Sequence, residues 1–231
     1  RDFCLSRGLG DVYKRQANIQ IKGFEKTEFE DNSFDVVVGN VPFGDFRLYD
    51  PRYKKMKLKV HDYFIRKSMD LLRPGGILAV VTSKGTLDKN ESTVRKNLAE
   101  QADLLGAVRL PADSFGKSAN TAVTSDLLFF QKKAEPLMGE PIWTYTGLTE
   151  DMVPVNEYYL EHPEMMLGKM VWFEQFFGKD SKYTALVNNA EDFDLEKGIL
   201  DAVGELPQNC YEESIAEKKE EAQDVLAASP K

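Results

Sequence analysis

Two short runs of apolar, mostly β-branched residues, 34–39 and 77–82, constrain the fold of this chain more than any other feature. Each run is bounded by turn-forming residues and shows no polar alternation, which predicts two strands buried inside a sheet. Between them, residues 61–72 carry an apolar stripe at helical spacing that stops at an Arg-Pro-Gly-Gly sequence. Strand, helix and strand in this order predict an open α/β sheet.

The pattern continues to about residue 133 and then changes. We expect a short strand over residues 19–24, a helix from Ser92 to about residue 101, and strands over 104–110 and 126–131. After Pro136, residues 165–177 predict an apolar helix or strand, and residues 212–228 an acidic helix or linker. The expected organisation is therefore a domain over 17–136, an α-rich or irregular extension over 137–206, and an acidic segment over 207–231.

Composition restricts the class of protein. The 231 residues are 42% hydrophobic, enough for one good core. The net charge of −8 is concentrated near the C-terminus, where residues 191–224 hold twelve acids and three bases, so the acidity does not argue against a nucleic-acid partner. Cys4 and Cys210 are too few and too distant in sequence for a disulfide framework or a zinc site. With no long apolar segment and no secretory signal, we expect a cytoplasmic protein without a membrane partner.

The first sixteen residues resemble translated adapter DNA. Residues 6–16, SRGLGDVYKRQ, correspond to codons that resemble a transposon mosaic-end sequencing adapter, and Arg1 and Asp2 fit the end of its flanking primer. We therefore expect Ala17 to be the first natural residue and leave residues 1–16 out of the fold. A disordered basic leader is the alternative interpretation.

The sequence Asn40-Val41-Pro42-Phe43 directly follows the first predicted strand, at the end where open α/β sheets bind ligands. An exocyclic amine on a nucleobase is a poor nucleophile, because its lone pair is delocalised into the ring. The Asn40 side-chain oxygen and the Val41 carbonyl would accept its two hydrogens and stabilise the charge that develops on alkylation. Pro42 holds Val41 extended, and Phe43 offers a flat face to a flipped-out base. The alternative is a simple strand-ending turn.

This loop resembles that of the amino-methyltransferase family, which includes the DNA adenine-N6 methylases and reads Asn or Asp, Pro, Pro and an aromatic residue. Val41 stands in place of the first proline, which predicts a less rigid loop. Residues 64–85 resemble the family's helix, Pro-Gly-Gly turn, strand and following loop, and residues 94–132 resemble the closing segments of type I restriction modification subunits. The resemblance covers roughly residues 24–133.

The resemblance implies a fold and an activity. The fold would be the C-terminal half of a Rossmann-like, S-adenosylmethionine-dependent methyltransferase sheet, truncated at its N-terminus. The parent enzyme would be a DNA adenine-N6 methyltransferase that binds its cofactor through Glu28, Phe29 and Asn40. The family holds the methionine part of the cofactor on a glycine-rich turn, and no such turn precedes Glu28, so we expect this fragment to be inactive alone.

A wider resemblance concerns partners. The segment HPEMMLGKM and several earlier segments together resemble the methylase part of large methylase–helicase proteins of conjugative mobile elements. This implies a helicase region farther along the same polypeptide, although no helicase motif lies in these residues.

Six basic residues, one Asp and two Tyr lie between positions 47 and 59, just after the predicted catalytic loop. Basic side chains there suit contacts with DNA phosphates, although a solvated surface loop is the alternative. His61 and His162 have no ligand partners in the pattern, so no metal is expected. The DNA-binding candidates are Arg47, Arg52, Lys54, Lys55, Lys57 and Lys59.

Two rival functions stay open at this point. A similar loop also occurs in enzymes that methylate a protein glutamine or an RNA guanine amine, and the basic loop favours a nucleic acid. The chain could instead be a non-catalytic DNA-binding or interaction module of a mobile element. Such a module would keep its DNA affinity but transfer no methyl group.

Overall fold

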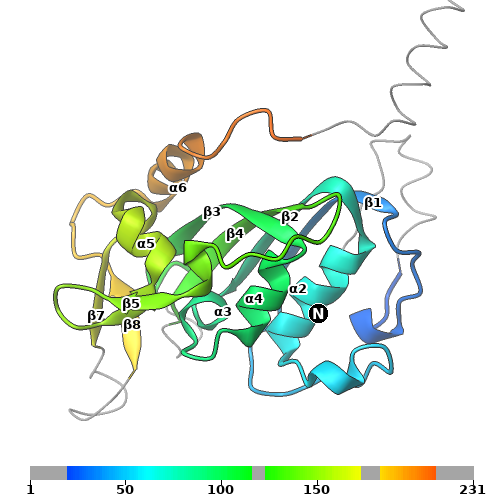
Figure 1. Ribbon diagram of the computed structural model, residues 1–231. Coiled ribbons are helices and arrows are strands. Elements are labelled where there is room, and N and C mark those ends of the chain that lie inside the picture. Colours follow the sequence, from blue (N-terminus) through cyan, green and yellow to red (C-terminus); the bar gives the residue numbers. More distant parts are fainter. Residues whose placement is uncertain (1–19, 116–122, 173–182, 212–231) are drawn as a thin grey trace, which may run out of the picture.

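The computed structural model describes residues 20–115, 123–172 and 183–211, which are built around one four-stranded mixed sheet (Figure 1). Its strands are β1 (Phe34–Asn40), β2 (Leu72–Ser83), β3 (Ala102–Leu110) and β4 (Ser125–Lys132), in the order β1-β2-β4-β3. Strand β1 runs parallel to β2, whereas β4 is antiparallel to both of its neighbours. The α/β sheet predicted from the residue pattern is confirmed.

Helices α2 (Val60–Leu71) and α4 (Thr93–Ala99) pack beside the sheet (Figure 1). The apolar stripe of α2 is buried, as the spacing predicted, and α2 with the 3₁₀ turn η2 (Lys54–Met56) forms the crossover between the two parallel strands. A short helix, α3 (Gly85–Asp88), follows β2. Helix α4 begins after Ser92, as predicted, but the Glu91 carboxylate, not Ser92, accepts the Thr93 backbone N–H (2.7 Å).

The predicted Arg-Pro-Gly-Gly turn is a bulge inside β2. Phe34 pairs with Leu72 and Val36 with Ile77, so four residues of β2 have no counterparts in β1. Gly75 has a φ of 77°, and a Cβ on Gly76 would lie 2.8 Å from the Asp35 carbonyl oxygen. The two glycines therefore let the chain leave the ladder and rejoin it.

The strand expected over residues 19–24 is wrong for the part that the structure describes. Residues 20–23 form no regular element, and Phe24–Lys26 form the 3₁₀ turn η1. The ring of Phe24 is buried against Phe64 of α2, with 4.9 Å between ring centroids. Packing of this one ring on the helix, rather than pairing with a strand, decides the local structure.

The extension after Pro136 packs on the sheet. Trp143, Val155, Tyr159 and Leu186 are buried in the same hydrophobic cluster as the sheet residues. The extension was expected to be α-rich or irregular, but its described residues form two small antiparallel sheets of two strands each as well as helices. The domain boundary at residue 136 stays a prediction, and residues 1–16 and the acidic segment 212–228 lie outside the described residues. The elements of the extension are η4 (Ile142–Thr144), β5 (Thr146–Leu148), β6 (Pro154–Asn156), α5 (Glu157–Glu161), η5 (Pro163–Met165), β7 (Lys169–Trp172), β8 (Thr184–Val187) and α6 (Leu195–Gly204).

A buried guanidinium joins the sheet to the extension. Arg109 of β3 is fully buried and donates through Nε to Asp126 of β4 (2.8 Å) and through Nη1 to Asp88 of α3 (2.7 Å). Its guanidinium lies 4.3 Å from the ring centroid of Tyr159 in α5, and Asp88 also accepts the backbone N–H of Asn156 (3.0 Å). One side chain thus connects three separate segments.

Strand β1 is buried on one face only, so the expectation that residues 34–39 are buried on both faces is wrong for the described part of the chain. Val37 is fully buried, whereas Val36 and Val38 are 36% and 59% exposed. The face of the sheet away from α2 and α4 is partly covered by the extension (Figure 1). There, Gly106 of β3 contacts Tyr158 of α5 and Leu206, which follows α6. This cover lies over β3, at the opposite edge of the sheet from β1.

We expect Arg109→Ala to lower the free energy of unfolding by about 3–5 kcal/mol, because it leaves two buried carboxylates without their cation. Urea unfolding followed by circular dichroism measures the change. Lys197→Ala, which removes an exposed ion pair with Asp201, is the control and should have little effect. Equal unfolding midpoints for the two variants would contradict this role of Arg109.

Candidate active site

The Asn40-Val41-Pro42-Phe43 loop begins at the carboxyl end of β1. The Asn40 side chain is exposed and forms no hydrogen bond with any described residue. The Val41 N–H donates to the Val81 carbonyl of β2 (2.9 Å), and the Val41 side chain is only 1% exposed. A proline could not donate this bond. Valine therefore anchors the loop at the position where the sequence predicted reduced rigidity.

The rest of the loop carries an exposed aromatic residue, Phe43, close in sequence to these acceptors. Phe43 is partly exposed, and no described residue donates a hydrogen bond to the Val41 carbonyl. Gly44 has a φ of 154°, and a Cβ there would lie 2.8 Å from the Phe46 ring, so the turn needs glycine. The Phe46 carbonyl accepts the Val60 N–H (3.0 Å), which fixes the loop to the start of α2. The arrangement can offer two hydrogen-bond acceptors and one flat apolar surface to a ligand.

A buried polar network holds the segment that follows. The Asp50 carboxylate accepts from the Tyr63 hydroxyl (2.8 Å) and lies 3.4 Å from the Lys67 ammonium group, which also donates to the Phe24 carbonyl (2.8 Å). Burial opposes ionisation of Asp50, but the bonds from Tyr63 and the Arg52 backbone N–H, with the charge of Lys67, lower its pKa below the usual value. Burial also lowers the pKa of Lys67.

Sequence reasoning missed this network. Its one signal is Lys67, a lysine that falls among the buried positions of an amphipathic helix. A buried lysine needs a carboxylate or carbonyl partner, and nothing in the local pattern says which one it finds.

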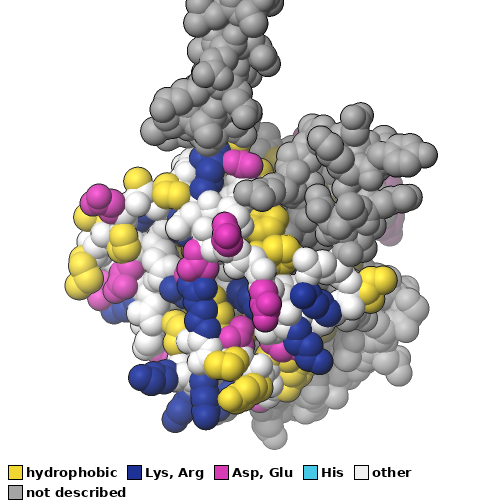
Figure 2. All heavy atoms as spheres, turned by 90° about the vertical axis from the view of Figure 1, so that its right-hand side faces the viewer, with side chains coloured by type: hydrophobic (Ala, Val, Ile, Leu, Met, Phe, Trp, Pro, Cys, Tyr) yellow, Lys and Arg dark blue, Asp and Glu magenta, His cyan; other side chains and the backbone are white. Residues whose placement is uncertain are grey.

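The six predicted DNA-binding side chains divide into two groups. Arg52 makes a bidentate pair with Asp31 (2.6 Å for both bonds), and Lys59 pairs with Asp45. The hydrogen bond from Arg52 lowers the pKa of Asp31. The remaining four are exposed and form no ion pair within the described ranges: Arg47, Lys54, Lys55 and Lys57. Figure 2 shows the face of the molecule that lies on the right in Figure 1. Along its lower edge, Lys and Arg side chains are interleaved with hydrophobic ones (Figure 2).

The two histidines lie in different environments, one buried and one exposed. His61 is buried at the start of α2, with Nε2 3.0 Å from the Lys89 ammonium group, and burial lowers its pKa. His162 lies near Glu164 on the surface. Over the described ranges no group of three or more His, Cys, Asp or Glu side chains could hold a metal ion. None of the helices described is both long and apolar enough to span a bilayer.

The predicted cofactor residues do not come together. The Phe29 ring packs against Phe34 at the start of β1, with 5.2 Å between centroids, and Glu28 is exposed beside it. Asn40 is at the other end of the same strand, about 20 Å away at roughly 3.3 Å per residue. The described residues therefore do not bring together a complete S-adenosylmethionine site. The cofactor roles of Glu28 and Phe29 stay predictions.

The sequence model of the family described as N-6 DNA Methylase matches residues 9–194. The "Defense against restriction protein B" of Escherichia phage P1 is 30% identical over 182 residues, which are 74% of this chain and 7% of the phage protein. The chain thus spans a small part of that relative. The family match includes residues 9–16, and the adapter origin of residues 1–16 stays a prediction.

Solved structures show weaker likeness. The M protein of the type I restriction enzyme EcoKI has a TM-score of 0.35 and 22% identity, covering 45% of this chain and 22% of that protein. A modification subunit assigned to a type I restriction enzyme of Vibrio vulnificus has a TM-score of 0.37 and 25% identity, covering 46% and 24%. A chain of a type I restriction–modification complex has a TM-score of 0.39 and 20% identity, covering 87% and 46%.

We expect Tyr63→Phe to lower the free energy of unfolding by about 1–3 kcal/mol, because Asp50 loses a buried donor. The pKa of Asp50 in the folded protein lies below its usual 3.8, so the difference from wild type should be complete above about pH 4 and shrink as the pH falls through the folded value. Urea unfolding between pH 2.5 and pH 7 measures the loss of unfolding free energy and its dependence on pH. Tyr49→Phe, whose hydroxyl has no partner among the described residues, is the control; an equal loss there would contradict the assignment.

Proposed function

Because the chain belongs to the N-6 DNA Methylase family, we propose that its Asn40-Val41-Pro42-Phe43 loop binds the target adenine of a DNA adenine-N6 methyltransferase. One observation carries the proposal. The Asn40 amide and the Val41 carbonyl have no hydrogen-bond partner among the described residues at the carboxyl end of β1, and the exposed Phe43 follows them within three residues of the same loop. An acceptor pair next to an aromatic face suits the two N–H bonds and the ring of a flipped adenine.

The residues would act on the amine as follows. The Asn40 side-chain oxygen and the Val41 carbonyl each accept one N6 hydrogen, which draws the nitrogen lone pair out of conjugation with the ring. Both acceptors also stabilise the positive charge that develops on N6 during methylation. The anchoring bond from Val41 to Val81 holds the carbonyl in place, so little reorganisation is needed. S-adenosylmethionine, which the family implies, would supply the methyl group.

The wider setting is also part of the proposal. Since Glu28 and Phe29 lie at the far end of β1 from Asn40, we infer that the chain alone does not bind the cofactor productively. A mobile-element origin is supported by similarity to a phage protein, over 7% of that protein's length. We also propose that the natural polypeptide carries a helicase region farther along the chain.

The exposed cations after the loop favour DNA over a protein substrate. Arg47, Lys54, Lys55 and Lys57 carry four positive charges within eleven residues, and the carboxylates of Asp31 and Asp45 are paired with other side chains. A phosphate backbone would neutralise such a cluster, whereas a glutamine side chain would gain nothing from it.

The first test is Asn40→Ala in a polypeptide that contains this chain and transfers methyl groups to DNA. We expect kcat to fall on the order of 100-fold or more, with DNA affinity nearly unchanged, because the lost acceptor acts mainly as charge develops. Asn189→Ala, at another exposed asparagine, is the control. A wild-type kcat in Asn40→Ala would show that the catalytic assignment is wrong.

The second test replaces Lys54, Lys55 and Lys57 together by Ala. Binding to all DNA sequences should weaken alike, and the slope of log affinity against log salt should flatten by up to about 0.9 per lost phosphate contact on duplex DNA. Fluorescence anisotropy at several salt concentrations measures the slope. The matched control replaces the exposed Lys22, Lys26 and Lys197. Equal affinity and slope in the first triple variant would favour a protein substrate.

A further inference from the structure

Two neighbouring cavities flank the segment that follows the catalytic loop. The first, here the tyrosine cavity, has a volume of about 270 Å³ and is walled by Tyr49, Tyr53 and Tyr63. The second, the lysine cavity, has a volume of about 520 Å³ and includes Lys59 and Lys89. Both cavities share three lining residues: Arg47, Lys57 and Leu58. The two cavities therefore adjoin each other at these three residues, which are called the ridge below.

The tyrosine cavity combines a fixed wall with one free ring. Tyr53 donates to Asp70 (2.7 Å) and Tyr63 donates to Asp50 (2.8 Å), and the two rings meet edge to face at 5.4 Å. Tyr49 is 69% exposed, and among the described residues the Lys54 ammonium group lies over its ring, at 5.8 Å. The buried hydroxyls hold the wall in place, whereas Tyr49 remains available to stack on a ligand.

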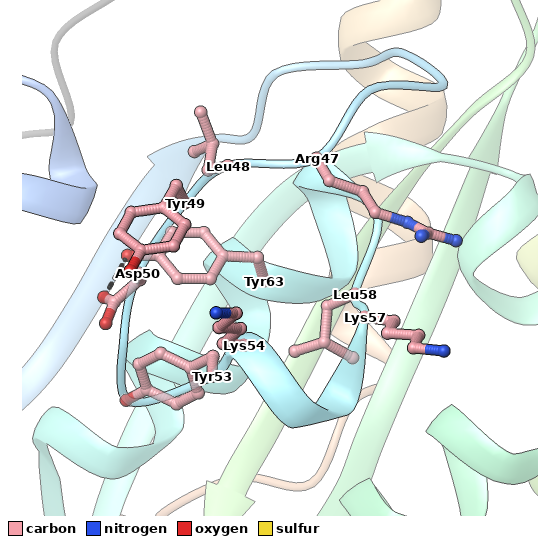
Figure 3. Close-up of a pocket in the computed structure, with 9 residues that line it drawn as sticks. All are labelled: Arg47, Leu48, Tyr49, Asp50, Tyr53, Lys54, Lys57, Leu58 and Tyr63. Atoms are coloured by element: carbon pink, nitrogen blue, oxygen red, sulfur yellow. Dashed lines mark hydrogen bonds between the residues drawn. The ribbon is translucent and has the colours of Figure 1, made fainter.

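The cations of the ridge point away from the tyrosine rings (Figure 3). In Figure 3 the charged ends of Arg47 and Lys57 extend to the same side, away from the three tyrosines, and neither forms an ion pair within the described part of the chain. Both residues also line the lysine cavity, where the Lys89 ammonium group donates to Asp62 (2.7 Å). A ligand that spans the ridge would place a flat group on the tyrosines and an anion at the ridge cations.

Nucleic acid has this alternation, because each flat base is joined to an anionic phosphate. The tyrosine cavity is slightly smaller than the roughly 300–1,000 Å³ of typical small-molecule pockets, so it suits one base rather than a base pair. Bases of any sequence stack on aromatic side chains, and cations track the backbone. The cavity begins three residues after Gly44, so its ligand would lie close to the target base.

We propose that the tyrosine cavity binds a second, unpaired base of the DNA substrate, adjacent to the target adenine, with its phosphate at Arg47 and Lys57. This inference rests on the proposed function and deepens it. The enzyme would then prefer DNA in which a nucleotide next to the target is unpaired over fully paired DNA. Tyr49 is the stacking platform.

The test uses the 231-residue chain and two labelled oligonucleotide duplexes of equal sequence around one adenine. One is fully paired, and the other leaves the neighbouring nucleotide, 2-aminopurine, unpaired. We expect tighter binding of the unpaired substrate and quenching of its 2-aminopurine fluorescence. Tyr49→Ala should weaken binding to the unpaired substrate on the order of 10-fold and restore the fluorescence, with binding to the paired duplex unchanged. Tyr49→Phe should behave as wild type, and Tyr145→Ala, at an exposed tyrosine of the extension, is the control.

The outcomes separate this inference from the proposed function. Equal binding of both substrates by the wild type, without quenching, would overturn the base site and leave methylation untouched. An equal loss for both substrates in Tyr49→Ala would also overturn it, because Tyr49 would then be a general surface contact. No binding of either DNA by the wild type would instead count against the proposed function itself.

Discussion

The structure depends on the burial of one arginine. A guanidinium with no exposed surface is stable only if its donors and its charge are satisfied, and Arg109 meets this condition with Asp126 and Asp88. The two carboxylates, together with Tyr159, raise the pKa of Arg109 well above its usual value against the opposing effect of burial, so it stays charged. Asp88 belongs to α3, which follows β2, and Tyr159 belongs to the extension. The contacts of Arg109 therefore hold both α3 and the extension against the sheet.

This constraint positions the candidate site. Strand β2 ends beside the loop at residues 40–43, where Asn40 pairs with Val81 and Val41 donates to the same residue. Helix α3, whose last residue Asp88 binds Arg109, begins just beyond that end. A rigid carboxyl edge lets an exposed amide and a bare carbonyl keep their geometry without partners of their own.

The cations near the candidate site fall into two groups, those with carboxylate or carbonyl partners and those without carboxylate partners among the described residues. Buried or paired cations, such as Lys67 and Arg52, stabilise the segment after the loop at residues 40–43 by binding carboxylates and carbonyls. The cations left without carboxylate partners in the described ranges, such as Arg47 and Lys57, lie on the rim of two cavities. A chain with a net charge of −8 can thus present a locally basic surface to a polyanion.

The sequence by itself determined the four strands of the main sheet, helices α2 and α4, and the position of the loop at residues 40–43. Local patterns suffice for these, because a β-branched run predicts a strand, an apolar stripe predicts α2, and a polar tetrapeptide after the strand must lie at its carboxyl end. Only the tertiary structure decided that β4 lies between β2 and β3, and which charges are engaged. Arg52 meets Asp31 across 21 positions, and Lys67 meets the Phe24 carbonyl across 43. Such pairings are set by strand order and burial, which leave no periodic trace in the sequence.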